Sequence, residues 1–238
     1  MKKDPAAGQK QAASERAAEF VESGMVVGLG HGSTAAFAVA RIARRIAEGD
    51  LKGILAVPCS IEVAEAAEEL GIPLTSLDDR PVIDLTIDGA DEVDPDMNLI
   101  KGGGGALLRE KVVACASRRE VIVVDESKLS ERLGTRFALP VEVVPFARGT
   151  ETRFLESLGA RVEVRGGDSP FLTDARNLIL DCRWPGIEDA HGLARRLDER
   201  PGIVAHGLFL DLATDLIVAG ANGVEHRVRS GPRGGVAE

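Results

Sequence analysis

The chain has 238 residues, of which 44% are hydrophobic and 28% are charged, so it can bury a sizeable core and is not disordered as a whole. A formal charge of −9 and only 3% aromatic residues argue against nucleic acid as a partner, because phosphate binding needs a basic face and base stacking needs aromatic rings. No apolar run approaches the roughly 18 residues of a membrane span, and polar residues 1–10 contain no signal peptide, so we expect a cytoplasmic protein without a membrane partner.

The first part of the chain alternates short apolar strands with amphipathic helices. The predicted helices cover 9–23, 33–48, 61–70 and 106–116, and the predicted strands cover 25–29, 54–57, 82–87 and 120–124. Strands that alternate with helices in this way indicate βαβ units and a mainly parallel sheet covered on both faces, so we expect an α/β fold.

The pattern changes after about residue 134. The predicted strands there cover 141–144, 161–164 and 178–182, and the predicted helices cover 150–158 and 187–199. This pattern fits a small ferredoxin-like α+β domain, and a further strand at 215–219 returns to the first sheet. We therefore expect one domain of residues 1–133 plus about 208–230, a second of residues 134–207, and a disordered tail at 231–238 that is rich in glycine.

The segment 28–34, with the sequence GLGHGST, lies between a predicted strand and a predicted helix. Glycines let the backbone approach an anion, and the free N–H groups of the helix start complement its charge. The spacing differs from G-x-G-x-x-G, and no lysine follows the last glycine, so neither a dinucleotide site nor a P-loop is indicated. A tight turn with a serine cap is the alternative to a phosphate cradle.

Carboxylates follow the strand predicted at 82–87, in the sequence DGADEVD of residues 88–94. The carboxyl ends of parallel strands are where doubly wound proteins bind ligands. The alternatives are a solvated acidic loop and a divalent-metal site with oxygen ligands.

Lys101 precedes four glycines, Gly102 to Gly105, and a helix that contains Glu110. Such a loop can line an oxyanion site with its amides, with the lysine beside it and the glutamate one turn into the helix. The alternative for Glu110 is an ion pair with a neighbouring arginine.

Lys128 follows another strand end, where it could meet a phosphate or could lie on the surface after a helix cap. The four histidines show no metal-ligand spacing with each other or with the cysteines, so we expect no metal site, and no nucleophile motif is present. A phosphate cradle, acid–base carboxylates and a cationic oxyanion stabiliser are together the groups that move a proton next to a carbonyl.

With these motifs, the sequence resembles the ribose-5-phosphate isomerases of type A. The resemblance is carried by the segments GLGHGSTAA, LTIDGADEVDPDMNLIKGGGGALLREKVVA, VDESKLSERLG with LPVEVVPFA, a weaker TDARNLILD, and GLFLDLATDLIVAGANGV. It covers most of residues 10–224. It implies a Rossmann-like main domain with a smaller α+β domain, and a homo-oligomer, most simply a homodimer. The implied reaction interconverts D-ribose 5-phosphate and D-ribulose 5-phosphate through an enediolate, without metal or organic cofactor.

The resemblance also implies catalytic roles for four residues. Glu110 would be the base that carries a proton between C1 and C2, and Asp88 and Asp91 would hold the sugar hydroxyls and assist ring opening. Lys101 would stabilise the developing oxyanion.

Further residues are implied to bind the substrate, either its phosphate end or its sugar. They are Lys10, His31, Gly32, Ser33, Thr34, Gly89, Ala90, Gly102, Gly103, Gly104 and Lys128, together with Asp88, Asp91 and Lys101. One departure is His31, which stands where the family usually has threonine, so the side-chain contact at this position is open. The alternative functions are a non-catalytic sensor of sugar phosphates and an isomerase or deaminase for another phosphosugar.

Overall fold

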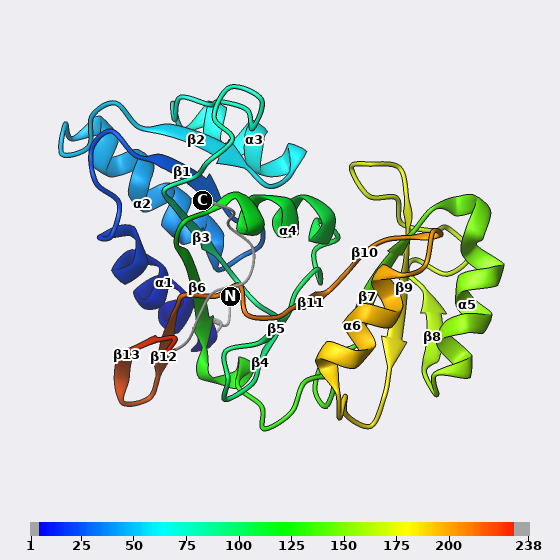
Figure 1. Cartoon of the computed structure of the whole chain (residues 1–238). Helices are drawn as coiled ribbons and strands as arrows, with labels where there is room; N and C mark the ends of the chain where they lie inside the picture. The colour runs from blue at the N-terminus through cyan, green and yellow to red at the C-terminus, as the bar shows by residue number, and fades with distance from the viewer. Residues whose placement is uncertain (1–4, 231–238) are drawn as a thin grey trace. The chain divides into compact units, whose positions relative to one another are not determined.

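The computed structural model describes residues 5–230, so the predicted disordered tail at 231–238 lies outside the described residues. The chain forms two compact units (Figure 1). The first contains the described residues up to Ala90, Arg109–Lys128 and those from Asp211 onward, and the second contains Asp91–Leu108 and Leu129–Leu210. These units place residues 91–108 with the small sheet, whereas the domain boundaries expected from the sequence stay a prediction.

The first unit is built on a six-stranded sheet with the order β13-β12-β6-β3-β1-β2. All neighbouring strands are parallel except β12 and β13, which form an antiparallel hairpin. The strands are β1 (Val26–Leu29), β2 (Leu55–Pro58), β3 (Leu85–Asp88), β6 (Glu120–Asp125), β12 (Asp215–Gly220) and β13 (Gly223–Val228). The predicted α/β architecture is confirmed, and the strand predicted at 215–219 does return to the first sheet.

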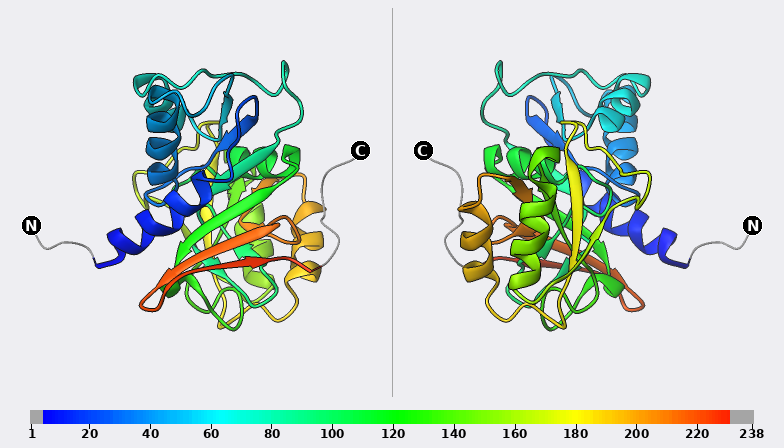
Figure 2. Two further views of the ribbon diagram at one scale, coloured as in Figure 1. Left: turned by 90° about the vertical axis from the view of Figure 1, so that its left-hand side faces the viewer. Right: turned by 90° about the vertical axis from the view of Figure 1, so that its right-hand side faces the viewer.

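Helices pack on this sheet through buried apolar side chains. In α2 (Ala35–Ala47) the buried Ala38, Val39 and Ile42 lie on one face at helical spacing. Helix α1 (Pro5–Ala18) packs against α2, β6 and β12 (Figure 2) and buries small side chains, which allow a close approach. The remaining helices are α3 (Ile61–Glu69), α4 (Leu107–Ala116), whose first two residues belong to the second unit, and the 3₁₀ helix η1 (Glu126–Lys128).

The second unit contains a four-stranded antiparallel sheet with the order β10-β7-β9-β8. Its elements follow one another as β7 (Leu139–Val143), η2 (Pro145–Ala147), α5 (Arg148–Ser157), β8 (Arg161–Val164), β9 (Leu178–Arg183), α6 (Ala190–Asp198) and β10 (Ile203–His206). This βαββαβ succession with that strand order confirms the predicted ferredoxin-like architecture. A small three-stranded sheet, β11-β5-β4, completes the unit with β4 (Glu92–Val93), β5 (Leu99–Ile100) and β11 (Leu208–Phe209).

None of the helices that the structure describes is long and apolar enough to cross a membrane. The parallel strands of the first sheet all end at one edge, where β1, β3 and β6 lead into the segments singled out from the sequence.

Candidate active site

The glycine-rich segment connects β1 to α2 in the first unit. Gly32 has a φ of 101°, in the left-handed region that favours glycine, and Gly32 and Ser33 are both exposed. Thr34 is the N-cap residue of α2, but its side chain makes no capping hydrogen bond to the helix. The loop borders a cavity of about 350 Å³ lined by α2 and α3. These features suit a loop that binds an anion with backbone amides and hydroxyls.

Asp88, the last residue of β3, lies directly against this loop. Its side chain is buried, and Oδ1 accepts hydrogen bonds from the backbone N–H groups of His31 (3.1 Å) and Gly89 (2.7 Å). A Cβ atom at Gly30 would collide with the Asp88 carboxylate, and one at Gly89 would lie 3.9 Å from Thr34 Cβ. The glycine loop and the turn after β3, up to Ala90, are therefore packed as one assembly.

The ring of His31 points away from the glycine loop, toward the start of α3. Its Nδ1 lies 3.0 Å from Ser60 Oγ, its Nε2 lies 4.0 Å from Glu62 Oε2, and its side chain is only 12% exposed. Ser60 is itself buried and caps α3 by accepting a hydrogen bond from the N–H of Val63. His31 thus fastens the loop to α3 through its side chain and to Asp88 through its amide. Ser60 was not identified from the sequence, where it could be read only as a helix cap.

Glu110 lies in the first turn of α4 and is only 5% exposed. Val113, three residues further, packs on β1, because a Cβ at Gly28 would lie 2.9 Å from Val113 Cγ1. Residues three apart share a helix face, so Glu110 lies on the face of α4 that meets the sheet. Because a helix that joins parallel strands runs opposite to them, its first turn lies at their carboxyl ends, as do Asp88 and the glycine loop.

Lys10 and Lys128 belong to the same unit. Lys10 precedes Ser14 by one helical turn, and Ser14 Oγ donates a hydrogen bond of 2.7 Å to the carbonyl of Thr34, so both side chains lie on the α1 face that meets the loop. Lys128 ends η1, beyond the carboxyl end of β6. Both lysines therefore lie near the carboxyl edge of the sheet.

In the second unit, Asp91 and the loop of four glycines are hydrogen-bonded to one another. The N–H of Gly103 donates to Asp91 Oδ2 at 2.7 Å, and the N–H of Asp91 donates to the carbonyl of Ile100 at 2.8 Å. Gly102 and Gly105 have positive φ angles, whereas Gly103 and Gly104 are exposed. The loop thus holds one carboxylate oxygen of Asp91 and presents exposed backbone beside it.

Lys101 is almost completely buried in the same unit, at 2% exposure. Its backbone N–H donates to the carbonyl of Gly207 at 2.9 Å, and its Nζ lies 5.4 Å from the centre of the Phe209 ring, within cation–π range. The backbone of Lys101 is therefore fixed and its side chain is enclosed by the second unit, unlike a mobile surface lysine.

Arg165 supports the glycine loop, a role that the sequence alone did not predict. Its NH1 donates to the carbonyls of Gly102 (2.9 Å) and Gly103 (3.1 Å), while its Nε and NH2 form a bidentate pair with Asp181. Nothing in the local sequence identifies it, because the contact joins segments about 60 residues apart, as the separation of Arg165 and Gly103 shows.

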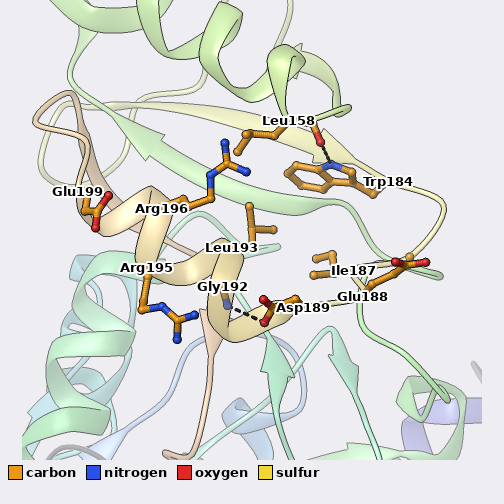
Figure 3. Close-up of a pocket in the computed structure, with 11 residues that line it drawn as sticks. Leu158, Trp184, Ile187, Glu188, Asp189, Gly192, Leu193, Arg195, Arg196 and Glu199 are labelled. Atoms are coloured by element: carbon orange, nitrogen blue, oxygen red, sulfur yellow. Dashed lines mark hydrogen bonds between the residues drawn. The ribbon is translucent and has the colours of Figure 1, made fainter.

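A further cavity, of about 500 Å³, lies within the second unit beside α6. Figure 3 shows Trp184, Leu193 and Arg196 among its lining. None of the residues predicted to bind substrate lines it. Among the described residues, no group of three or more histidine, cysteine, aspartate or glutamate side chains is arranged to hold a metal ion.

A family model described as ribose 5-phosphate isomerase A (phosphoriboisomerase A) matches residues 55–223. The chain belongs to the ribose 5-phosphate isomerase A family. A relative from Desulfatibacillum aliphaticivorans, named ribose-5-phosphate isomerase A, is 58% identical over 217 residues, which cover 90% of this chain and 94% of the relative.

Solved structures of the family are similar to this chain over nearly its whole length. The ribose 5-phosphate isomerase of Plasmodium falciparum has a TM-score of 0.91 and 35% identity, and the match covers 94% of this chain and all of that one (100%). A D-ribose-5-phosphate isomerase in complex with phospho-erythronic acid has a TM-score of 0.92 and 37% identity over 94% of this chain and 99% of its own. The family resemblance found in the sequence is confirmed.

Proposed function

We propose that this chain is an aldose–ketose isomerase that interconverts D-ribose 5-phosphate and D-ribulose 5-phosphate. The observation that carries the proposal is 58% identity, over most of the chain, to a protein of that name. The chain retains the groups that the reaction needs: a buried carboxylate at Glu110, a buried carboxylate at Asp88 and a buried lysine at Lys101. A sensor that only bound the sugar phosphate would need none of these for chemistry.

In the proposed mechanism, the phosphate of the substrate binds the first glycine loop. The amide of Gly32 and the hydroxyls of Ser33 and Thr34 supply donors, and Lys10 and Lys128 supply positive charge. Binding energy at the phosphate, which does not react, then positions the sugar for the chemical step.

The proton transfer is assigned to Glu110. With ribose 5-phosphate in its open form, the Glu110 carboxylate removes the proton from C2, and the electron pair of that C–H bond forms the C1=C2 bond of an enediolate while negative charge develops on O1. Lys101 and the amides of Gly102 and Gly104 stabilise this oxyanion, while the amide of Gly103 holds Asp91. The proton of the O2 hydroxyl passes to O1, C2=O forms, and Glu110 returns its proton to C1, which gives ribulose 5-phosphate.

The two aspartates are assigned to the hydroxyl groups of the sugar. Asp88 is fixed by the amides of His31 and Gly89, and Asp91 is fixed by the amide of Gly103. Each oxygen of a carboxylate can accept more than one hydrogen bond, so both side chains can also accept hydrogen bonds from the substrate. They also assist ring opening by removing the proton of the C1 hydroxyl and delivering a proton to the ring oxygen. Phospho-erythronic acid, which a solved relative binds, carries a phosphate and a carboxylate, and that carboxylate resembles the two oxygens of an enediolate.

The test is a coupled assay of the purified protein with ribose 5-phosphate. Formation of ribulose 5-phosphate, and the reverse reaction, support the proposal. Binding without turnover would identify a sensor, and faster turnover of another phosphosugar would identify a different isomerase or deaminase. A homodimer and a cytoplasmic location follow from the same family membership and are part of the proposal.

A further inference from the structure

One edge of the sheet in the first unit is formed by β13, which is paired with β12 on one side only. The strand is exposed along nearly its whole length, and its two valines, Val224 and Val228, are 44% and 64% exposed. An exposed edge strand presents unpaired backbone groups that can pair with another chain.

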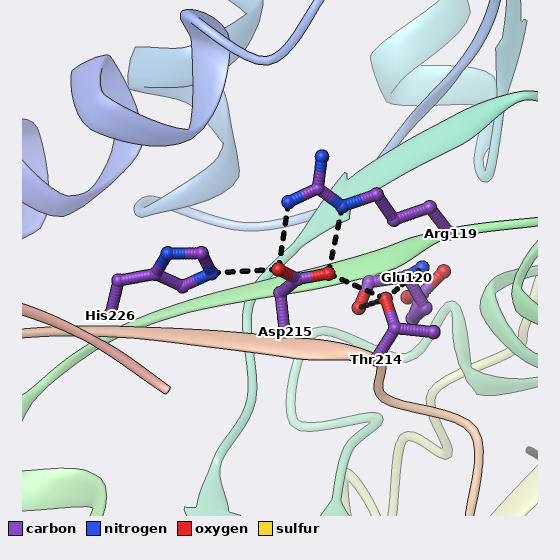
Figure 4. Close-up of polar contacts among 5 residues, drawn as sticks. All are labelled: Arg119, Glu120, Thr214, Asp215 and His226. Carbon is purple, nitrogen blue, oxygen red and sulfur yellow. Dashed lines mark hydrogen bonds and ion pairs between the residues drawn. The ribbon is translucent and has the colours of Figure 1, made fainter. Parts of the chain in front are cut away.

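This edge is held rigidly by a network of polar contacts (Figure 4). His226 Nε2 lies 2.7 Å from Asp215 Oδ1, and Asp215 also accepts two hydrogen bonds from Arg119 and one from Thr214. The ring of Phe20 stacks against both the Arg119 guanidinium (4.2 Å) and the His226 ring (5.2 Å). An edge fixed in this way loses little conformational entropy when it binds a partner.

The register of the hairpin shows which backbone groups face outward. The pairs run from Gly220 with Gly223 to Asp215 with Val228, and the N–H of Arg229 donates to the carbonyl of Thr214 at 2.9 Å. Hydrogen-bonded and non-hydrogen-bonded pairs alternate along an antiparallel ladder, so the odd-numbered residues of β13 direct their backbone groups to β12. The even-numbered residues, 224, 226 and 228, therefore direct theirs to the open edge.

We propose that β13 pairs with β13 of a second copy of this chain, antiparallel and about a two-fold axis at His226. In that register the outward backbone groups match, because His226 lies opposite His226 of the second copy and Val224 lies opposite its Val228. Glu225 then lies opposite the second copy's Arg227, in a non-hydrogen-bonded pair where the side chains are closest. The sequence VEHRV is self-complementary in charge.

The charges exclude the neighbouring symmetric registers. An axis at residue 225 would place Glu225 opposite itself, and an axis at residue 227 would place Arg227 opposite itself, so both registers bring like charges together. Within one chain, Arg227 already forms a bidentate pair with Glu225 at 2.8 Å, on one face of the strand. With the axis at His226, the four side chains of two copies alternate in sign around the axis.

The pairing gives the proposed homodimer a defined surface and joins the two sheets into one. None of the residues of the candidate active site lies on β13. A change in β13 that alters assembly but not turnover per chain therefore tests this inference without testing the isomerase proposal.

The first experiment compares assembly of three proteins by sedimentation velocity over a dilution series: the wild type, Arg227→Glu, and the double variant E225R/R227E. We expect a wild-type dimer, a dissociation constant raised at least about tenfold in Arg227→Glu because two attractive pairs become repulsive, and recovery in the double variant, which restores opposite charges. A monomeric wild type, an unchanged dimer in Arg227→Glu, or no recovery would overturn the proposal.

The second experiment tests the register by disulfide cross-linking with oxidised glutathione. Residues opposite each other in a hydrogen-bonded pair have Cα atoms about 5.5 Å apart, so His226→Cys should cross-link to its own copy. Val224→Cys should not, because the two copies of residue 224 are four positions apart along the ladder, about 14 Å. Mixing Val224→Cys with Val228→Cys should restore the cross-link. Cross-linking of Val224→Cys alone, or none at residue 226, would overturn the register.

Discussion

Replacing Glu110 by glutamine tests the central step of the proposed mechanism. The side chain lies in the first turn of α4 and is 5% exposed, so solvent has little access to act as a base in its place. Glutamine has nearly the same shape and volume but cannot take up the proton from carbon. We therefore expect Glu110→Gln to bind ribose 5-phosphate with an affinity close to that of the wild type and to lose turnover.

The size of the loss follows from the role assigned to the carboxylate. A positioned general base contributes about 10² to 10⁴ in rate, which corresponds to roughly 3 to 5 kcal/mol of transition-state stabilisation. The substitution keeps the volume of the side chain, so no cavity forms, and the variant should remain folded. A drop in turnover with stability intact is therefore the expected signature.

The assay measures turnover with ribose 5-phosphate, affinity by calorimetry and unfolding by urea on one preparation of each variant. Glu120→Gln is the matched control, because Glu120 is also buried in the first unit but lies at the amino end of β6, away from the carboxyl edge of the sheet. We expect the control to retain turnover. If Glu110→Gln stays within about threefold of the wild type, one of the two aspartates is the base and the assignment of Glu110 is wrong.

Three further predictions concern metal, the loop and acid stability. Because carboxylates and a lysine supply the charges, exhaustive chelation with EDTA should leave turnover unchanged; a loss that added Mn²⁺ or Zn²⁺ restores would make Asp88 and Asp91 metal ligands. His31→Thr should keep most of the turnover, because the amide that binds Asp88 is present in any residue; steady-state kinetics that show abolished turnover would assign the His31 ring a catalytic role. Burial alone would raise the pKa of Asp215, but hydrogen bonds from Arg119, Thr214 and His226 outweigh burial and lower it. The stability that this pKa shift contributes is present above about pH 4, the ordinary aspartate value, and is lost as the pH falls through the lower folded-state pKa. Asp215→Asn should lack this loss, as urea unfolding across a pH series would show; an equal slope in both proteins would contradict the assignment.

The α/β fold could be predicted because most of its elements carry a strong local signal. The buried strands β1, β3 and β6 read as apolar runs, and helices such as α2 have a clear apolar stripe. The strands of two residues, β4, β5 and β11, are too short to show any periodicity. β13 was missed because its residues are exposed and charged, and only pairing with β12 makes it a strand.

The site residues could be singled out because glycines, carboxylates and lysines occur together at predicted strand ends. The residues that hold these site residues in place could not be predicted, because they make contacts between segments that are distant in the sequence. Arg165 reaches the carbonyls of Gly102 and Gly103 from another part of the second unit, and the direction of the His31 ring depends on Ser60, which follows a different strand. Such contacts have no periodicity or spacing that a single sequence would reveal.

The tight fit between Gly30 and Asp88 has a consequence for variation in the loop. Any side chain at residue 30 would collide with the Asp88 carboxylate. Even an alanine there should therefore displace both the Asp88 side chain and the glycine loop. At the very next residue the ring turns toward α3 and only the amide meets Asp88, so polar side chains no larger than histidine, such as threonine, should be accepted there. Saturation mutagenesis should therefore find adjacent positions with opposite tolerance, and a graft of this loop into another scaffold would have to carry the end of β3 with it.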